Sequence, residues 1–474
     1  MTVESNPSIR YRIDSDYEKL TPVHAVWEIT LACNLNCGHC GSRAGKVRPD
    51  ELTTQECFDI IDKLHELGTR EITIIGGEAF LRNDWLEIIS RIDQAGMECS
   101  MQTGGYNLNE KRILDAKQAG IKNIGVSIDG LEDVHNQIRG KRDSYQHALN
   151  ALELLKKHGI TSSVNTVITK SNQHQLDELL DEFIVRGIKN WQIQLIVAMG
   201  NAVENDDLIL QPYEIIDLYE NLIKVYKRAL SHNILIQAGN NIGYYGPYEH
   251  IWRQGKDAFW TGCSAGHTAI GIEANGIIKG CPSLPTSDYT GGNIKDMTLD
   301  DIWYHSKQMK FTRHRNLDEL WGHCKSCYYA SSCMAGCTWT SHVLFGKRGN
   351  NPYCHHRALK LEKEGKRERI RKVQEAEGKP FDYGLFEIIV EDNNGNILEV
   401  QNPLENNEDT SAELKTEIRT FENLELCRDC NQHVYEGTEI CPHCNSNVPE
   451  AKERYETKLK DVYTAYDKLL ELMN

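Results

Sequence analysis

The chain has 474 residues, of which 40% are hydrophobic, and its formal net charge is −16. This length predicts about three domains, and the acidic balance argues against nucleic acid as a main partner because phosphate binding needs a basic footprint. No run approaches the roughly 20 apolar residues of a membrane-spanning helix, and the polar N-terminus lacks the apolar core of a signal peptide. We therefore expect a cytoplasmic protein with no membrane partner.

Strands and helices alternate through the first half of the chain. Hydrophobic periodicity predicts strands over residues 24–30, 71–75, 97–103, 123–128, 160–168 and 190–197. The segments between them predict helices, most of them followed by glycine, over residues 53–67, 84–95, 109–119, 144–158 and 174–185, with a further helix over 212–231. This order favours a parallel sheet with helices outside, whose binding sites gather at the carboxyl ends of the strands.

Three cysteines follow the first strand in a CxxxCxxC pattern: Cys33, Cys37 and Cys40. Three thiolates would leave one iron of a four-ligand cluster open to a substrate or cofactor. A zinc knuckle and three buried structural cysteines are the alternatives, but zinc usually takes its ligands from CxxC pairs. We expect an iron–sulfur cluster at the rim of the sheet.

This cysteine loop resembles that of the radical S-adenosylmethionine (SAM) enzymes. The resemblance implies a partial (β/α)6 TIM-type barrel and a 4Fe-4S cluster, held by the three catalytic cysteines, whose open iron binds SAM. One electron then cleaves SAM to a 5′-deoxyadenosyl radical that abstracts hydrogen from the substrate. The positions that match the family's cofactor-binding motifs are His39, Gly76, Gly77, Glu78, Ser127, Asp129 and Arg139. His39 stands where the family usually carries an aromatic ring, and a solvated surface charge is the alternative for Arg139.

A second group of cysteines lies between residues 263 and 354 and resembles the SPASM domain, which holds two auxiliary 4Fe-4S clusters. By this resemblance the outer cluster would be held by Cys324, Cys327, Cys333 and Cys354. The inner cluster would be held by Cys263, Cys281 and Cys337. These are three thiolates, so the inner cluster has an open iron or takes His267 as its fourth ligand. Zinc is the alternative for the CxxC part of the pattern.

Two further CxxC pairs close the sequence. Cys427, Cys430, Cys441 and Cys444 predict a zinc ribbon, with rubredoxin-type iron as the alternative. The ribbon would dock a partner or a precursor peptide, and His433 and His443 are expected to be bystanders. Cys57 and Cys99 are interpreted as small buried hydrophobes.

The remaining tail pattern predicts a charged helix over 360–374, a hairpin formed by 386–390 and 396–400, a linker over 402–415 and a helix over 449–473. The predicted division of the chain is a lead-in (1–22), the radical SAM barrel (23–237), the SPASM domain (238–375), a hairpin and linker (376–420), and the zinc ribbon with its helix (421–474).

Over residues 24–375 the sequence is similar to radical SAM/SPASM maturases of ribosomally made peptides, including the group associated with GDL-motif or Nif-type leader precursors. The resemblance implies SAM, three 4Fe-4S clusters, one zinc ion and a reductant such as flavodoxin or ferredoxin. The enzyme would crosslink a precursor peptide, epimerise its residues or excise a tyramine unit from it. About 22 leading residues are too few for a peptide-recognition domain, so a separate leader-binding protein is expected. The alternatives are a maturase of a protein, of the sulfatase or quinohemoprotein type, and a non-catalytic iron–sulfur electron carrier.

Overall fold

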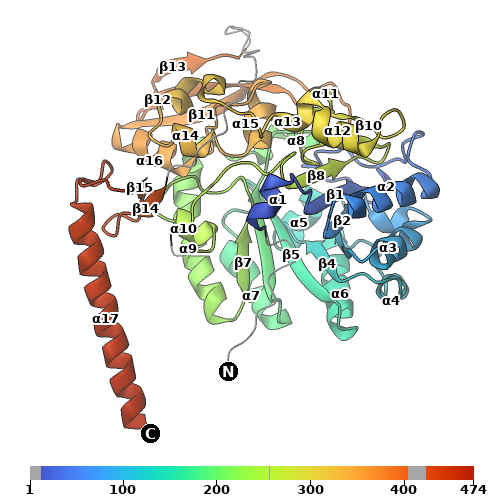
Figure 1. The fold of residues 1–474 in the computed structure, drawn as a ribbon, viewed down its shortest axis with the longest axis horizontal. Coiled ribbons are helices and arrows are strands. Elements are labelled where there is room, and N and C mark those ends of the chain that lie inside the picture. The colour runs from blue at the N-terminus through green and yellow to red at the C-terminus, as the bar shows by residue number, and fades with distance from the viewer. Residues whose placement is uncertain (1–11, 256, 404–422, 474) are drawn as a thin grey trace.

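The computed structural model describes residues 12–255, 257–403 and 423–473 (Figure 1). Its central element is a sheet that, among the described residues, has ten strands in the order β10-β9-β8-β1-β2-β3-β4-β5-β6-β7. These strands are β1 (His24–Glu28), β2 (Glu71–Ile75), β3 (Glu98–Thr103), β4 (Asn123–Ser127), β5 (Thr161–Ile168), β6 (Asn190–Leu195), β7 (Leu235–Ala238), β8 (Ala269–Ile272), β9 (Ile277–Lys279) and β10 (Gly292–Asn293).

Strands β1 to β7 are parallel, and β8 joins the other side of β1, also parallel. Strands β9 and β10 then continue the sheet in antiparallel fashion. The predicted partial TIM-type barrel is confirmed. The predicted strands are all present, whereas β7 and the extension β8–β10 were not foreseen.

Helices flank the parallel strands and bury one apolar face each against them (Figure 1). They are α2 (Thr54–Glu66), α3 (Trp85–Gln94), α4 (Glu110–Ala119), α5 (Glu132–Arg139), α6 (Ser144–Lys157), α7 (Leu176–Arg186) and α9 (Ile215–Ser231). Helix α2 shows why the helices could be predicted from sequence. Thr53 and Glu56 form the predicted capping box, and Ile60, Ile61 and Leu64 are buried. Helix α5 was not predicted.

The other helices are short. They are α1 (Asp14–Glu18), α8 (Asn201–Glu204), α10 (Glu249–Trp252), α11 (Thr286–Tyr289), α12 (Leu299–His305), α13 (Lys307–Lys310), α14 (Ala330–Cys333), α15 (Thr338–Phe345) and α16 (His355–Lys363). Along the described ranges, no helix combines the length and apolar character needed to cross a membrane.

The charged helix predicted over 360–374 is wrong from residue 364 onward. Helix α16 ends at Lys363, Gly365 follows with φ +70°, and β11 (Lys366–Gln374) begins. Side chains in β11 alternate between the two faces of the strand, which explains the difference. Glu368 and Ile370 are buried, whereas Arg367 and Arg369 pair with Glu391 of the neighbouring strand. A run of residues with charges of both signs can form either a charged helix or such a strand, so this sequence pattern does not distinguish the two.

Strands β11, β12 (Leu385–Asp392) and β13 (Ile397–Gln401) form an antiparallel sheet, which confirms the predicted hairpin. This sheet spans the proposed boundary at 375/376. The predicted linker reaches beyond the described residues from 404 onward. The C-terminal part contains β14 (Leu424–Leu426), β15 (His433–Tyr435) and the predicted closing helix, α17 (Val448–Met473), which projects away from the rest of the molecule (Figure 1).

Candidate active site

The carboxyl ends of the parallel strands surround one cavity of about 340 Å³. Nine of the sequence-predicted site residues line it: Cys33, Cys37, His39, Cys40, Gly76, Gly77, Glu78, Ser127 and Arg139. A larger and more open hollow of about 770 Å³ lies where β5 and β6 begin, and no predicted site residue lines it. Because ligands of parallel sheets bind at the carboxyl ends of strands, the smaller cavity is the candidate site.

The three cysteines of the loop are free thiols held by a network of backbone contacts. The Sγ atom of Cys33 accepts from the N–H of Leu35 at 3.4 Å, and that of Cys40 accepts from the N–H of Ala44 at 3.4 Å. The Sγ atom of Cys37 faces the Nη1 atom of Arg139 at 3.7 Å. Donors of this kind favour the thiolate over the thiol, which is the form that binds metal.

The donor set fits a cluster better than a single ion. Burial raises the pKa of Cys33 to about 11 and that of Cys37 to about 12, so metal binding must release protons from these thiols. Within the described ranges, the only group of three or more ligand atoms that lie within 4.8 Å of one another is at Cys427, Cys430, Cys441 and Cys444. The wider spacing of the loop thiols suits a larger iron–sulfur cluster rather than a zinc ion.

The two glycines after β2 allow the cysteine loop to approach closely. A Cβ atom on Gly77 would lie 2.1 Å from the carbonyl oxygen of Ala32 and 2.7 Å from the Cβ atom of Cys33. The N–H of Gly77 instead donates to the carbonyl of Thr30 at 2.9 Å. Glycine at position 77 therefore lets the end of β2 pack closely against the cysteine loop, in addition to any contact that it makes with a ligand.

We expect Gly77→Ala to lower the iron content and the rate of SAM cleavage and to destabilise the fold by about 1–3 kcal/mol, because the added methyl group would push the backbone next to Cys33. Iron analysis and thermal unfolding measure both effects. Gly45→Ala is the matched control, because it lies in the same loop and an added Cβ atom would meet nothing within 4 Å. Equal iron content in the two variants would contradict this prediction.

Glu78 lies at the end of β2, and its carboxylate already has two partners. It accepts a hydrogen bond from the hydroxyl of Thr103 and another, of 2.6 Å, from the N–H of Gly104. Burial raises the pKa of Glu78 to about 7 despite these donors. A cationic ligand group in the cavity would favour the charged form of Glu78.

Arg139 and His39 converge on Asp129, which lies behind the cavity wall and is fully buried. The Nη2 atom of Arg139 is 2.5 Å from the Oδ2 atom of Asp129, and the Nε2 atom of His39 is 3.4 Å from the same oxygen. Burial opposes ionisation, but Arg139 and the two nearby histidines hold the pKa of Asp129 below its usual value. Burial lowers the pKa of His39 to about 4, so this imidazole is neutral near pH 7. Asp129 therefore positions Arg139 at the end of α5.

We expect Arg139→Gln to destabilise the fold by about 3–5 kcal/mol, because it leaves the Asp129 carboxylate buried without its cation. Urea unfolding measures this loss, and equilibrium dialysis measures the accompanying loss of SAM affinity. Arg91→Gln is the control, since it breaks an exposed ion pair with Asp62 and a contact over the ring of Phe58, 6.0 Å from its centroid, and should cost about 1 kcal/mol. Similar losses in both variants would contradict the structural role of Arg139.

Sequence reasoning missed much of the remaining cavity lining. Gln102 and Gln194 line the cavity, whereas Asn165 is not part of the lining and donates a hydrogen bond to Gln102. Five of the unforeseen lining residues come from later segments of the chain: Met199, Pro282, Ser283, Trp339 and Phe381. No spacing signal in the sequence marks them, because they reach the cavity only through long-range packing.

The cysteines between residues 263 and 354 form two separate groups. Cys324, Cys327, Cys333 and Cys354 line one small cavity together with Tyr329. The other three lie near one another: burial and then the neighbouring thiol of Cys263 raise the pKa of Cys337 to about 12, with Cys281 adding to the effect. The ring of His267 packs against Tyr17, with 5.2 Å between centroids.

Family models match two stretches of the chain. The radical SAM superfamily model matches residues 27–183, and the SPASM model, described as an iron–sulfur cluster-binding domain, matches residues 263–328. The chain contains a radical SAM domain and a SPASM domain. It is therefore an enzyme with a radical SAM domain, and most residues that line the cavity at the strand ends belong to that domain.

Several characterised proteins are similar to this radical SAM enzyme. An AdoMet-dependent heme synthase of Methanosarcina barkeri is 28% identical over 70% of this chain and 95% of that protein. The mycofactocin maturase MftC of Mycolicibacterium smegmatis is 28% identical over 67% of this chain and 78% of its own length. The sporulation killing factor maturation protein SkfB of Bacillus subtilis is 23% identical over 61% and 67%, respectively.

Solved structures share the fold of this radical SAM enzyme. SuiB of Streptococcus suis bound to the precursor peptide SuiA aligns with a TM-score of 0.53 at 18% identity, covering 69% of this chain and 74% of SuiB. The enzyme anSMEcpe with bound AdoMet and a peptide aligns with a TM-score of 0.57 at 18% identity, covering 71% and 94%. At these identities the likeness concerns the fold.

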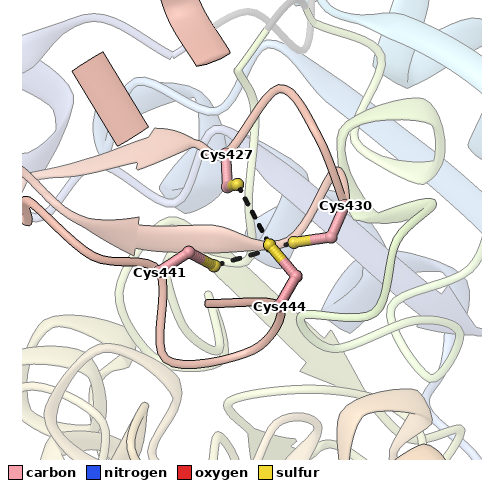
Figure 2. A group of neighbouring side chains, drawn as sticks. All are labelled: Cys427, Cys430, Cys441 and Cys444. Atoms are coloured by element: carbon pink, nitrogen blue, oxygen red, sulfur yellow. Dashed lines mark hydrogen bonds between the residues drawn. The ribbon is translucent and has the colours of Figure 1, made fainter. Parts of the chain in front are cut away.

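The C-terminal cysteines of the radical SAM enzyme gather at one point (Figure 2). The Sγ atoms of Cys427 and Cys444 are 3.7 Å apart, as are those of Cys430 and Cys441. Four thiols from two turns, all within 4.8 Å of one another, suit one tetrahedral metal ion. Neither nearby histidine belongs to this group.

The C-terminal metal-binding unit (residues 423–447) packs on the cavity of Cys324, Cys327, Cys333 and Cys354. Tyr329, a lining residue of that cavity, donates its hydroxyl to the carbonyl of His433 at 2.5 Å and lies 2.7 Å from the Nε2 atom of His443. On the same face, Arg428 pairs with Asp257 at 2.5 Å. Tyr329 thus contacts both the cavity of the four cysteines and the C-terminal unit, as does His356, whose ring centroid is 5.4 Å from that of His443.

Proposed function

We propose that this enzyme modifies a ribosomally made precursor peptide. The observation that carries the proposal is the cavity in which the three thiols of the cysteine loop, Glu78 and Arg139 lie beside an apolar wall. When bound, the cluster and SAM would supply a radical able to abstract hydrogen from carbon. Two of the relatives carry the names of peptide maturation proteins, and SuiB was solved with a precursor peptide.

Within this proposal the residues of the chain have distinct tasks. Cys33, Cys37 and Cys40 hold the catalytic cluster. Glu78 receives the ammonium group of SAM, and Arg139, fixed by Asp129, presents its guanidinium to the carboxylate. Ser127, His39 and the two glycines complete the cofactor site. The protein acts in the cytoplasm, and flavodoxin or ferredoxin supplies the electron.

The auxiliary metal sites belong to the same proposal. The outer 4Fe-4S cluster is assigned to Cys324, Cys327, Cys333 and Cys354, and the inner one to Cys263, Cys281 and Cys337. The inner cluster has either an open iron or His267 as its fourth ligand. The C-terminal thiols hold one zinc ion, and the unit that this ion orders covers the outer cluster.

The test is co-expression with any short peptide encoded beside the gene, followed by mass spectrometry. A loss of tyramine indicates excision, a loss of two hydrogens indicates a crosslink, and unchanged mass with an inverted residue after hydrolysis indicates epimerisation. The proposed subgroup, with GDL-motif or Nif-type leaders, further predicts a separate leader-binding protein. Tight binding of the precursor by this chain alone would contradict that part.

The heme synthase relatives favour a second candidate, an enzyme that acts on a heme precursor, because one of them is matched over 95% of its length. Conversion of a heme precursor by the reduced enzyme, with every co-expressed peptide unchanged in mass and configuration, would support it. Modification of a large partner enzyme in place of a peptide would indicate a protein maturase. If SAM remained intact after incubation with the enzyme and a strong reductant, the protein would instead be a non-catalytic electron carrier.

A further inference from the structure

The segment of residues 378–383, here called the strap, returns from the β11–β12 connection to the cysteine loop of the radical SAM domain. The Oδ1 atom of Asp382 in the strap is 2.7 Å from the Nε atom of Arg43, which follows the last loop cysteine by three positions. The carbonyl of Asp382 accepts from the N–H of Gly200 at 2.9 Å. A backbone N–H of the strap also donates to the carbonyl of Gly41 at 3.2 Å. These contacts fix the strap beside the catalytic cysteines.

Phe381 sits at the centre of the strap in an unfavourable backbone conformation. Its φ angle is +58°, in the left-handed region that bulky residues rarely occupy. The turn is held by the Oδ2 atom of Asp382, which accepts from the N–H groups of Gly378 and Lys379 at 2.6 and 2.8 Å. Glycine would adopt this conformation without strain. The presence of phenylalanine despite the strain points to a role for its phenyl ring.

The ring of Phe381 forms part of an apolar wall of the cavity. It packs with Val197, Met199 and Trp339, and all four line the cavity that also holds the cysteines. The Nε1 atom of Trp339 donates to the Sδ atom of Met199 at 3.0 Å, which fixes the indole. On Phe381, the Nζ atom of the buried Lys279 lies 3.9 Å from the ring centroid. The wall is therefore preformed and built from three distant segments.

We propose that Phe381, Trp339 and Met199 form a specificity pocket that holds an apolar or aromatic side chain of the substrate. The inference rests on the proposed function for the identity of the substrate as a peptide. An apolar wall accepts apolar groups by excluding water, whereas a charged side chain would lose its hydration without a partner there. Phe381 acts on specificity through ring contact, and the strap positions it.

The experiment measures pocket chemistry without the natural substrate. The reconstituted enzyme with SAM is titrated with N-acetyl amides of phenylalanine, leucine, lysine and glutamate, and binding is followed by saturation-transfer NMR. We expect the phenylalanine and leucine amides to bind at least tenfold more tightly than the charged ones. Phe381→Gly should weaken binding of the phenylalanine amide about tenfold, the upper range for one aromatic contact.

Two further variants keep the test decisive. Tyr383→Phe is the matched control, because it changes an aromatic residue of the strap that is not part of the cavity lining and should keep wild-type affinities. Phe381→Leu retains an apolar side chain and should fall between wild type and Phe381→Gly. Iron content and SAM binding of each variant establish that it is folded.

Equal binding of lysine and phenylalanine amides by the wild type, no detectable binding of any apolar amide, or unchanged affinity in Phe381→Gly would each overturn the specificity pocket. None of these readouts requires a modified peptide. A failed co-expression experiment would therefore overturn the proposed function while leaving this result to stand on its own.

Discussion

Replacing Cys37 by serine is expected to abolish reductive cleavage of SAM, with a loss of at least about a hundredfold, beyond the usual cost of changing a residue outside the ligand set. Cys37 lies in the cavity with its sulfur 3.7 Å from the Nη1 atom of Arg139, and a serine hydroxyl is a poor ligand for iron. Chromatography of deoxyadenosine after reduction measures the loss, and iron analysis should show the absence of one cluster.

The control for this experiment is Cys57→Ala. Cys57 is buried in α2 and belongs to none of the cysteine groups described above, so its replacement should leave the iron content unchanged at a cost of roughly 1 kcal/mol in stability. Wild-type cleavage by Cys37→Ser, or equal iron loss in both variants, would refute the assignment of the catalytic loop.

Removal of the C-terminal metal is expected to unfold residues 423–447 and to expose the outer cluster. Cys441→Ser takes away one of four ligands, and the binding free energy of such a structural site, about 10–16 kcal/mol for zinc, is largely folding free energy. The hydroxyl of Tyr329 then loses both hydrogen-bond partners provided by the C-terminal unit. Hydrogen exchange should increase in residues 423–447 and around Tyr329, and the cluster absorbance should bleach faster in air.

Glu453→Gln is the corresponding control, because Glu453 is exposed on α17 and its replacement leaves all four thiols in place. It should retain one metal ion per chain and the wild-type bleaching rate. If Cys441→Ser loses its metal but bleaches no faster than this control, the C-terminal unit does not protect the outer cluster.

Local sequence patterns were sufficient for the barrel strands and most of its helices. Strand β2 is the clearest case: it is a short run after Gly68 whose first four residues are all buried, and burial on both faces leaves few alternatives for such a run. The prediction failed at β11, where Arg367, Arg369 and Arg371 alternate with buried residues. Their partners, Glu387 and Glu391, lie in another strand, so the sequence in isolation carries no sign of the pairing.

The candidate site divides in the same way. Motif spacing predicted nine of the lining residues, because they lie within a few residues of strand ends in the sequence or at a fixed spacing from them. It did not indicate that Asp129 holds Arg139 from behind, which requires the position of α5. Nor did it indicate Phe381, which reaches the cavity only because Arg43 and Asp382 join segments 339 positions apart.

The amino-acid order alone determined which chemistry this protein can carry, since thiol spacing and strand-end glycines are local features that survive without a fold. The three-dimensional packing decided what surrounds that chemistry: the apolar wall beside the loop thiols, and the contact of Tyr329 with both the cavity of the outer cysteines and the C-terminal unit. Such contacts depend on the summed burial of many residues far apart in the chain, and no short window of sequence contains that sum.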